Sequence, residues 1–180
     1  VTANLRVECS CYSEVAEFMH SHFEEIYRGL PQNTFLAQDY CSSKERYYRE
    51  VGDFFLFKHG SLIVGAFVGT PIDWSSYYLR NCSILPSHQG KRMYQNLLAH
   101  LLSVLKKYNV EKAEGDVSPA NLGHIHILNK LQFNISGINL SERWGGLLHF
   151  TKYLSERHEK VFLDQFCHGI RPQTQKAPGP

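Results

Sequence analysis

The stretch ILPSHQGKRMYQNLL, residues 84–98, joins an apolar, strand-like segment to a leucine-rich run. The pattern predicts that a strand over 76–85 ends here and that a helix over 89–108 begins. A glycine and two cations, residues 90–92, fall in the first turn of that helix. Unpaired N–H groups and the positive end of the helix dipole favour a phosphate there. We therefore expect an anion-binding turn, with a merely solvated basic helix start as the alternative.

Strands and helices alternate on both sides of this stretch. Before it we expect a strand over 5–9, a helix over 13–28, a helix from residue 42, and a hairpin that turns at His59 and Gly60. After it we expect a strand over 110–117, a helix over 121–131, and a closing hairpin over 135–154. The strand, helix, strand, helix order predicts a parallel pair of strands. The fold class is therefore α/β, a mixed sheet flanked by helices.

Length and composition indicate one domain. The chain has 180 residues, of which 43% are hydrophobic, enough for one sizeable core. We expect the domain to span residues 1–154. A helix over 155–168 follows, with an apolar stripe that docks on the domain or on a second copy in a homodimer. Residues 169–180 are expected to form a flexible tail because they are poor in apolar side chains.

Charge and cysteine content exclude several classes of protein. The formal net charge is only +2, which does not favour nucleic acid or an anionic membrane as partners. The apolar runs are too short for a membrane span, and residues 1–30 lack the pattern of a signal peptide, so we expect a cytoplasmic protein. The five cysteines include no CxxC pair. We expect reduced thiols and no metal site.

Two segments resemble one known family. The stretch over 84–98 resembles the acyl-CoA-binding segment of the GNAT-type N-acyltransferases, V-x-P-x-x-[QR]-x-x-G-x-[GA]-x-x-L-L, with Ile84, Pro86 and Gln89 in register. The stretch NLGHIHILNKLQF, residues 121–133, resembles the later segment N-x-x-A-I-x-L-Y-x-K-L-G-F. It matches at Asn121, Ile125, Lys130, Leu131 and Phe133. The two segments occur in the order and spacing of the family.

The resemblance implies a fold and a donor site. The central parallel strands, over 77–85 and 110–117, would splay apart and admit the pantetheine arm of coenzyme A. Main-chain groups of residues 83–85 would bind that arm and hold the thioester oxygen, and the turn over 89–94 would bind the pyrophosphate. The implied donor-binding residues are Ile84, Leu85, Gln89, Gly90, Lys91, Arg92, Met93, Tyr94, Asn121 and Leu128.

Three departures from the family pattern bear on donor binding and catalysis. Arg92 and Tyr94 replace the small residues of the turn, and Leu128 replaces the tyrosine that protonates the departing thiolate. A thiol has a pKa of about 8.5, so its departure near neutral pH does not require that acid. The candidates for catalytic roles are Tyr78, Asp116, Asn121 and His124. Their structural alternatives are a packing aromatic, a turn residue, a helix cap and a packed histidine.

Aromatic residues crowd the segments expected to cover the splayed strands. Such side chains suit a broad, amphipathic pocket for the acceptor, a small-molecule or peptide amine. The predicted acceptor-binding residues are Tyr40, Trp74, Tyr77 and Trp144. A second layer of hydrophobic core is the alternative.

Three functions fit the sequence. The first is an N-acyltransferase in which an amine attacks the thioester of acetyl-CoA or another acyl-CoA directly. The second transfers a longer acyl group from long acyl-CoA or from acyl carrier protein, whose acidic surface would suit Lys91, Arg92, Lys106 and Lys107. The third is a catalytically silent module that binds an acyl thioester or a protein partner.

Overall fold

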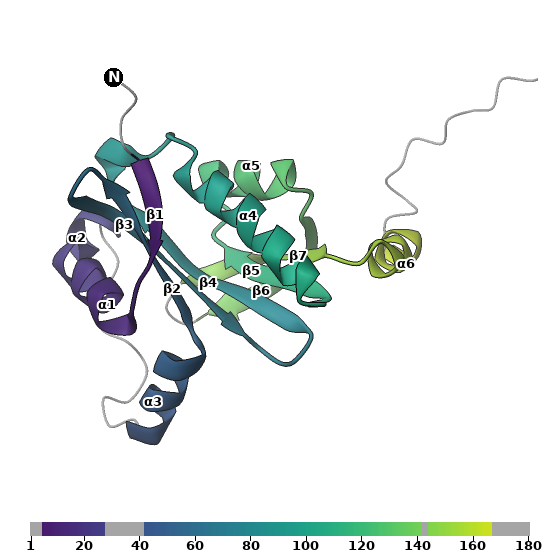
Figure 1. Ribbon diagram of the computed structural model, residues 1–180. Helices are drawn as coiled ribbons and strands as arrows, with labels where there is room; N and C mark the ends of the chain where they lie inside the picture. Colours follow the sequence, from purple (N-terminus) through teal and green to yellow (C-terminus); the bar gives the residue numbers. More distant parts are fainter. Residues whose placement is uncertain (1–4, 28–41, 142–143, 167–180) are drawn as a thin grey trace, which may run out of the picture.

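The computed structural model describes residues 5–27, 42–141 and 144–166 (Figure 1). Seven strands form one sheet in the order β1-β2-β3-β4-β5-β7-β6. The strands are β1 (Leu5–Cys9), β2 (Asp53–His59), β3 (Leu62–Pro71), β4 (Ser76–Ile84), β5 (Lys112–Val117), β6 (Asn134–Ser141) and β7 (Gly145–Tyr153). The helices are α1 (Tyr12–Ser21), α2 (Phe23–Ile26), α3 (Ser42–Val51), α4 (Met93–Lys107), α5 (Leu122–Lys130) and α6 (Glu156–Phe166), with a 3₁₀ turn, η1 (Pro86–His88).

The expected α/β fold class is confirmed. Strands β4 and β5 are parallel, and every other neighbouring pair in the sheet is antiparallel. Helices α4 and α5 lie on one side of the sheet, and α1 and α2 lie on the other (Figure 1). The β4–β5 pair lies in the middle of the sheet, as the alternation of strands and helices predicted.

The core is built from apolar stripes on the helices that face the sheet. The buried stripe of α4 consists of Met93, Tyr94, Leu97, Leu98, Leu101, Leu102 and Leu105. On the other side, Val15 and Phe18 of α1 are buried, and α1 contacts β2 and β3. Leu98 is 0% exposed, so truncating it to alanine would cost about 2–5 kcal/mol. This packing fixes α4 against the sheet, and with it the turn that precedes the helix.

Two helices differ from the sequence expectation. The helix expected over 13–28 is divided into α1 and α2 at His22, and residue 28 lies outside the described residues. The helix expected from residue 89 begins only at Met93. Gly90 and Arg92 have φ values of 75° and 60°, in the left-handed region, and a right-handed helix cannot pass through them.

Helix α6 follows β7. Phe162 of α6 packs its ring against Tyr153 at a centroid distance of 5.4 Å, and Glu159 lies 3.8 Å from Lys152. Val161 of the same helix is 47% exposed. The expected boundaries at 154 and 168 stay predictions, and the expected tail over 169–180 lies outside the described residues. No helix in the described part of the chain is long and apolar enough to cross a membrane.

Candidate functional site

Strands β4 and β5 separate after three residue pairs. Both strands are fully described, and their pairing stops at Tyr78 and Glu114. Leu85 N–H donates to Val64 O of β3 at 2.9 Å. Peptide groups of successive residues alternate in direction, so those of Ile84 face the gap beside β5. An extended ligand lying in this gap could pair with main-chain groups of β4.

The turn over 89–92 closes one end of this gap. The side-chain amide of Gln89 donates to the carbonyl oxygen of Ile84 at 3.0 Å. Gly90, Lys91 and Arg92 are all exposed, and α4 begins immediately after them. Two full positive charges therefore lie beside the N–H groups of the first turn of α4, an arrangement that favours a phosphate.

Two residues at glycine positions of the family pattern have a left-handed backbone. Arg92 and Gln132 stand at these positions, and their φ values are 60° and 62°. This is the region of φ that glycine adopts most readily. Anion binding by residues 89–92 stays a prediction.

Tyr94 does not lie in the turn. It is the second residue of α4, it is buried, and its ring packs against Phe67 of β3 at 6.0 Å and against His124 of α5 at 5.0 Å. The Tyr94 hydroxyl lies 3.1 Å from Nε2 of His124. Burial raises the pKa of Tyr94 well above its usual value and lowers the pKa of His124 to about 4. His124 is therefore neutral at pH 7, and its ring shares one hydrogen bond with the Tyr94 hydroxyl.

The remaining predicted donor residues divide between surface and core. Asn121 is exposed and caps α5, because its Oδ1 accepts from His124 N–H at 3.1 Å. Leu85, Met93 and Leu128 are buried in the hydrophobic core. The side chains of these three residues stabilise the fold. The main-chain N–H and C=O of Leu85 are bonded to Val64 and His88, and the C=O of Leu128 accepts from Phe133 N–H.

Tyr78 and Asp116 meet on the face of the sheet opposite α4 and α5. Ala113 and Val117 of β5 are buried on the helical face, so the alternating Glu114 and Asp116 point the other way. The Tyr78 hydroxyl donates to Oδ2 of Asp116 at 2.7 Å. Burial, followed by this hydrogen bond, raises the pKa of Tyr78, which is a neutral phenol at pH 7. The two residues belong to β4 and β5, where the strands begin to separate.

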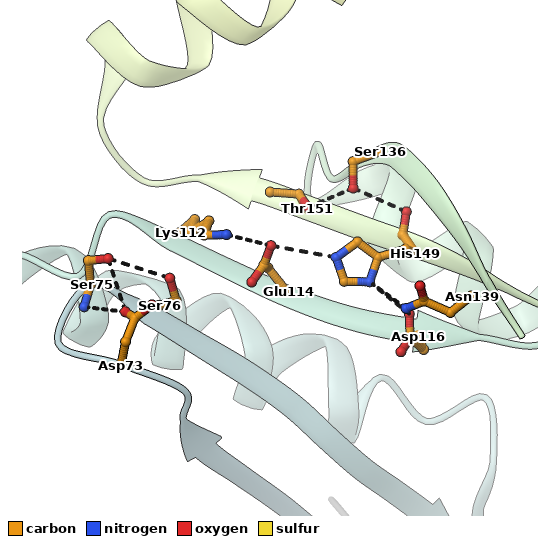
Figure 2. Close-up of polar contacts among 10 residues, drawn as sticks. All are labelled: Asp73, Ser75, Ser76, Lys112, Glu114, Asp116, Ser136, Asn139, His149 and Thr151. Carbon is orange, nitrogen blue, oxygen red and sulfur yellow. Dashed lines mark hydrogen bonds and ion pairs between the residues drawn. The ribbon is translucent and has the colours of Figure 1, made fainter. Parts of the chain in front are cut away.

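Four further residues complete this polar cluster, and the sequence analysis missed all of them. Figure 2 shows His149 of β7 between Asp116 and Glu114 of β5. Asn139 of β6 donates to Oδ1 of Asp116 at 2.8 Å, and Lys112 Nζ lies 2.8 Å from Oε1 of Glu114. The period-2 spacing of Lys112, Glu114 and Asp116 was a signal in the sequence. Within the described residues, no group of His, Cys, Asp and Glu is arranged to hold a metal ion.

A bulge in β4 adds two more polar residues to this face. The β3–β4 register shifts between Val68 and Gly69, and Arg80 is left without a partner in β3. Beyond the bulge, Asn81 and Ser83 point to the face that carries Tyr78. Both bind a residue of the opposite layer, Tyr27, which directly follows α2.

Tyr27 ties α2 to the unpaired part of β4. Ser83 Oγ donates to Asn81 Oδ1 at 2.7 Å, and Asn81 Nδ2 donates to the Tyr27 hydroxyl at 2.9 Å. The Tyr27 hydroxyl lies 2.7 Å from Ser83 Oγ. Its ring lies 5.7 Å from that of Trp144. Beside these residues lies an open surface pocket of about 270 Å³ that is lined by Met19, His20, Phe23, Tyr27, Asn81 and Trp144.

Of the predicted acceptor-binding residues that the structure describes, only Trp144 lines this pocket. Tyr77 is buried, and its hydroxyl donates to Asp53 Oδ2 at 2.8 Å. Trp74 is 95% exposed in the turn between β3 and β4, at the opposite end of β4 from Gln89. Tyr40 lies outside the described residues. The structure thus separates Trp74 and Tyr77 from Trp144.

The four cations that would suit the acidic surface of acyl carrier protein lie at the two ends of α4. Lys91 and Arg92 precede the helix, and Lys106 and Lys107 are its last two residues. At 1.5 Å per residue, a 15-residue helix separates the two pairs by roughly 20 Å. Only the first pair borders the gap between β4 and β5.

A family model described as the acetyltransferase (GNAT) family matches residues 16–133. No curated protein matches the sequence. The fold is similar to that of a putative acetyltransferase from Salmonella typhimurium with acetyl-CoA, with a TM-score of 0.64, 14% identity, and coverage of 86% of this chain and 96% of that one. The ribosomal-protein-S18-alanine N-acetyltransferase from Escherichia coli gives a TM-score of 0.64 at 15% identity, covering 84% and 94%. Spermidine N-acetyltransferase from Vibrio cholerae in complex with CoA and spermine gives a TM-score of 0.60 at 16% identity. That match covers 83% of this chain and 95% of the other one.

Proposed function

Because the chain belongs to the acetyltransferase (GNAT) family, we propose that it is an N-acyltransferase that uses acyl-CoA. It transfers the acyl group to the amine of a small molecule or peptide. The observation that carries this proposal is the separation of β4 and β5 beyond Tyr78, next to the positive-φ turn at Gly90 and Arg92. One extended gap with a cationic turn at its end suits a donor that has a linear arm and a pyrophosphate.

The donor-binding groups come mainly from the backbone. Peptide groups of Ile84 face the gap and would pair with the pantetheine arm. Lys91, Arg92 and the first N–H groups of α4 would hold the pyrophosphate through charge-assisted hydrogen bonds. Gln89 supports this surface by binding Ile84 O. The Salmonella typhimurium neighbour contains acetyl-CoA and the Vibrio cholerae neighbour contains CoA, which supports acetyl-CoA as the first donor to test.

The acceptor approaches from the face that carries Tyr78 and Asp116. Tyr78 already donates its proton to Asp116, so its oxygen can accept a hydrogen bond from the attacking amine. The pocket beside Asn81 and Trp144 would hold the body of the acceptor. Its lining consists of aromatic side chains, the thioether of Met19 and the amide of Asn81, and no carboxylate occurs among the described residues that form it. This favours an amine with an apolar or aromatic body over a polyamine.

The chemistry on the donor side requires no tyrosine acid. Leu128 is buried and has no proton to give, and Asn121 is a helix cap. His124 is neutral and bonded to Tyr94, so its role is to position α5 against α4. Alignment of amine and thioester supplies most of the acceleration, and a main-chain N–H of β4 stabilises the charge that develops on the thioester oxygen.

We also propose a cytoplasmic location. Among the described cysteines, Cys9, Cys11 and Cys82 are free thiols. Free thiols are usual in a reducing compartment. A homodimer contact through the exposed side of α6 remains a proposal, for which Val161 is the relevant apolar residue.

Native mass spectrometry with parallel product detection tests the function. The purified chain is mixed with acetyl-CoA, a long-chain acyl-CoA or an acylated carrier protein, and with phenethylamine or spermidine as acceptor. We expect binding of an acyl-CoA and formation of an acylated arylalkylamine. Binding without product for every amine would support a silent module instead. If only the acylated carrier protein binds, it is the donor in place of acyl-CoA. If no thioester binds, the proposal is overturned.

A further inference from the structure

His149 lies between two carboxylates on the acceptor face. Its Nδ1 is 2.7 Å from Oδ1 of Asp116, and its Nε2 is 3.5 Å from Oε1 of Glu114 (Figure 2). The backbone sets up this contact, since β7 pairs with β5 and His149 stands directly opposite Asp116. The side chains of His149, Asp116 and Glu114 are 22%, 16% and 12% exposed. The three groups therefore interact at short range and largely out of water.

The contact through Nδ1 is the hydrogen bond of this group. With a proton on Nδ1, His149 donates to Oδ1 of Asp116. On the other side of the ring, Oε1 of Glu114 lies near Nε2 and also binds Lys112 Nζ at 2.8 Å. The ring of His149 is therefore held between the two carboxylates of β5.

Asp116 connects His149 to the residue that faces the acceptor. Its Oδ1 accepts from His149 and from Asn139 Nδ2, and its Oδ2 accepts from the Tyr78 hydroxyl. Three donors from three strands leave the carboxylate one orientation. That orientation fixes where the Tyr78 proton points and hence where the lone pairs of its oxygen point.

We propose that His149 is a positioning residue for acyl transfer. By holding Asp116 it fixes the Tyr78 hydroxyl, so that the Tyr78 oxygen accepts a hydrogen bond from the amine as the amine nitrogen bonds to the acyl carbon. The C–S bond of the thioester then breaks and coenzyme A leaves as its thiolate. The proton that the nitrogen loses passes through solvent to that thiolate, so the products are the amide and coenzyme A. No covalent bond to His149 forms at any point. This inference rests on the proposed N-acyltransferase function and adds a residue that the sequence motifs do not contain.

Other groups around His149 support the same arrangement without replacing it. Asn139 Nδ2 lies 3.4 Å from His149 Nδ1 but also donates to Asp116. Ser136 of β6 binds Thr151 Oγ1 at 2.7 Å, beside His149 on β7. Among the described residues of this cluster, His149 is the one that forms a hydrogen bond or ion pair with both Asp116 and Glu114.

A double-mutant cycle with Tyr78→Phe and His149→Leu tests the proposal. Each single variant should lower kcat about tenfold, a transition-state loss of about 1.4 kcal/mol, with unchanged affinity for acetyl-CoA. The double variant should lose no more than Tyr78→Phe alone, because His149 acts through Tyr78. Multiplied losses of about a hundredfold, or wild-type activity of His149→Leu, would overturn the proposal.

Two conservative variants keep the test decisive if leucine destabilises the fold. The amide of His149→Asn reaches the Nδ1 position and still donates to Asp116, so most of kcat should return. The amide of His149→Gln reaches instead toward Glu114, so its kcat should stay low. Equal losses in both variants would overturn the proposal. If the wild-type chain transfers no acyl group to any amine, the proposed function itself is overturned. If the wild-type chain is active and the losses of kcat in the two single variants add, only the proposed role of His149 is overturned.

Discussion

The hydroxyl of Tyr94 lies 3.1 Å from Nε2 of His124, which joins the first turn of α4 to the first turn of α5. The two helices lie on the same side of the sheet, over the region where β4 and β5 separate (Figure 1). Burial of the His124 ring disfavours its protonated form and lowers its pKa. The buried ring therefore makes the fold sensitive to acid.

We predict that stability falls with pH below about 6.5. The pKa of His124 is lowered from 6.5 to about 4 by burial, so the unfolded chain binds a proton more readily than the folded chain between these values. Above pH 6.5, titration of His124 does not change the free energy of unfolding. As pH falls toward 4 its contribution to the free energy of unfolding drops by up to ~1.4 kcal/mol per pH unit, ~3 kcal/mol at most. Urea unfolding of the full chain from pH 8 to 4 measures this.

The variant His124→Gln is the control for that experiment. Its side-chain oxygen can accept from Tyr94 near the position of Nε2, and it does not titrate. At pH 7 it should unfold within about 1 kcal/mol of the wild type, and at pH 4.5 it should be the more stable of the two. A wild-type and variant pair whose difference stays constant over the whole pH range would contradict the burial of a neutral His124.

A second prediction concerns the left-handed backbone at Gln132. Gln132 has a φ of 62° and is exposed, so its side chain contributes little packing while its backbone is strained. Gln132→Gly should raise the free energy of unfolding by about 0.5–1 kcal/mol. Asn109→Gly is the matched control: its φ is 60°, but asparagine tolerates this region, so the gain should be smaller. Equal gains at both positions, or none, would contradict the strain argument.

The order of elements and the turn between β4 and α4 were predictable because they depend on local sequence. The cations at residues 91 and 92 and the alternation of strand and helix are visible within short windows. Tyr94 was predicted in the turn but is buried, because it is the second residue of α4 and belongs to the stripe of that helix that packs on the sheet.

The other polar residues on the face of Tyr78 and Asp116 could not be predicted, because their positions depend on long-range strand pairing and on a bulge. Strict alternation from Tyr78 would place Asn81 and Ser83 on the opposite face, and the extra residue Arg80 reverses this. His149 reaches Asp116 only through the register of β7 on β5. A single sequence carries no local sign of either relationship.

A third prediction addresses the donor turn. Arg92→Glu replaces a positive charge next to the first N–H groups of α4 by a negative one, so affinity for acetyl-CoA should fall more than tenfold, about 1.4 kcal/mol. Lys107→Glu makes the same charge change at the far end of α4 and should leave the affinity within about threefold of the wild type, at physiological salt. Titration calorimetry with acetyl-CoA compares them. Equal losses would indicate a general charge effect, and no loss for Arg92→Glu would remove the turn from the donor site.

The last prediction separates the two tryptophans of the chain. Trp144 packs near Tyr27 and lines the pocket beside the unpaired part of β4, whereas Trp74 is 95% exposed at the other end of that strand. If the pocket holds an aromatic amine, Trp144→Ala should raise the acceptor KM about tenfold or more, because an aromatic pair contributes about 0.5–1.5 kcal/mol beyond the apolar area that it buries. Trp74→Ala should leave KM and kcat unchanged, and both variants should bind acetyl-CoA like the wild type. Steady-state rates with phenethylamine and spermidine measure the effect. An equal rise in KM for both amines in Trp144→Ala would show that the pocket does not select an aromatic body, and a rise in Trp74→Ala alone would place the acceptor at the opposite end of β4.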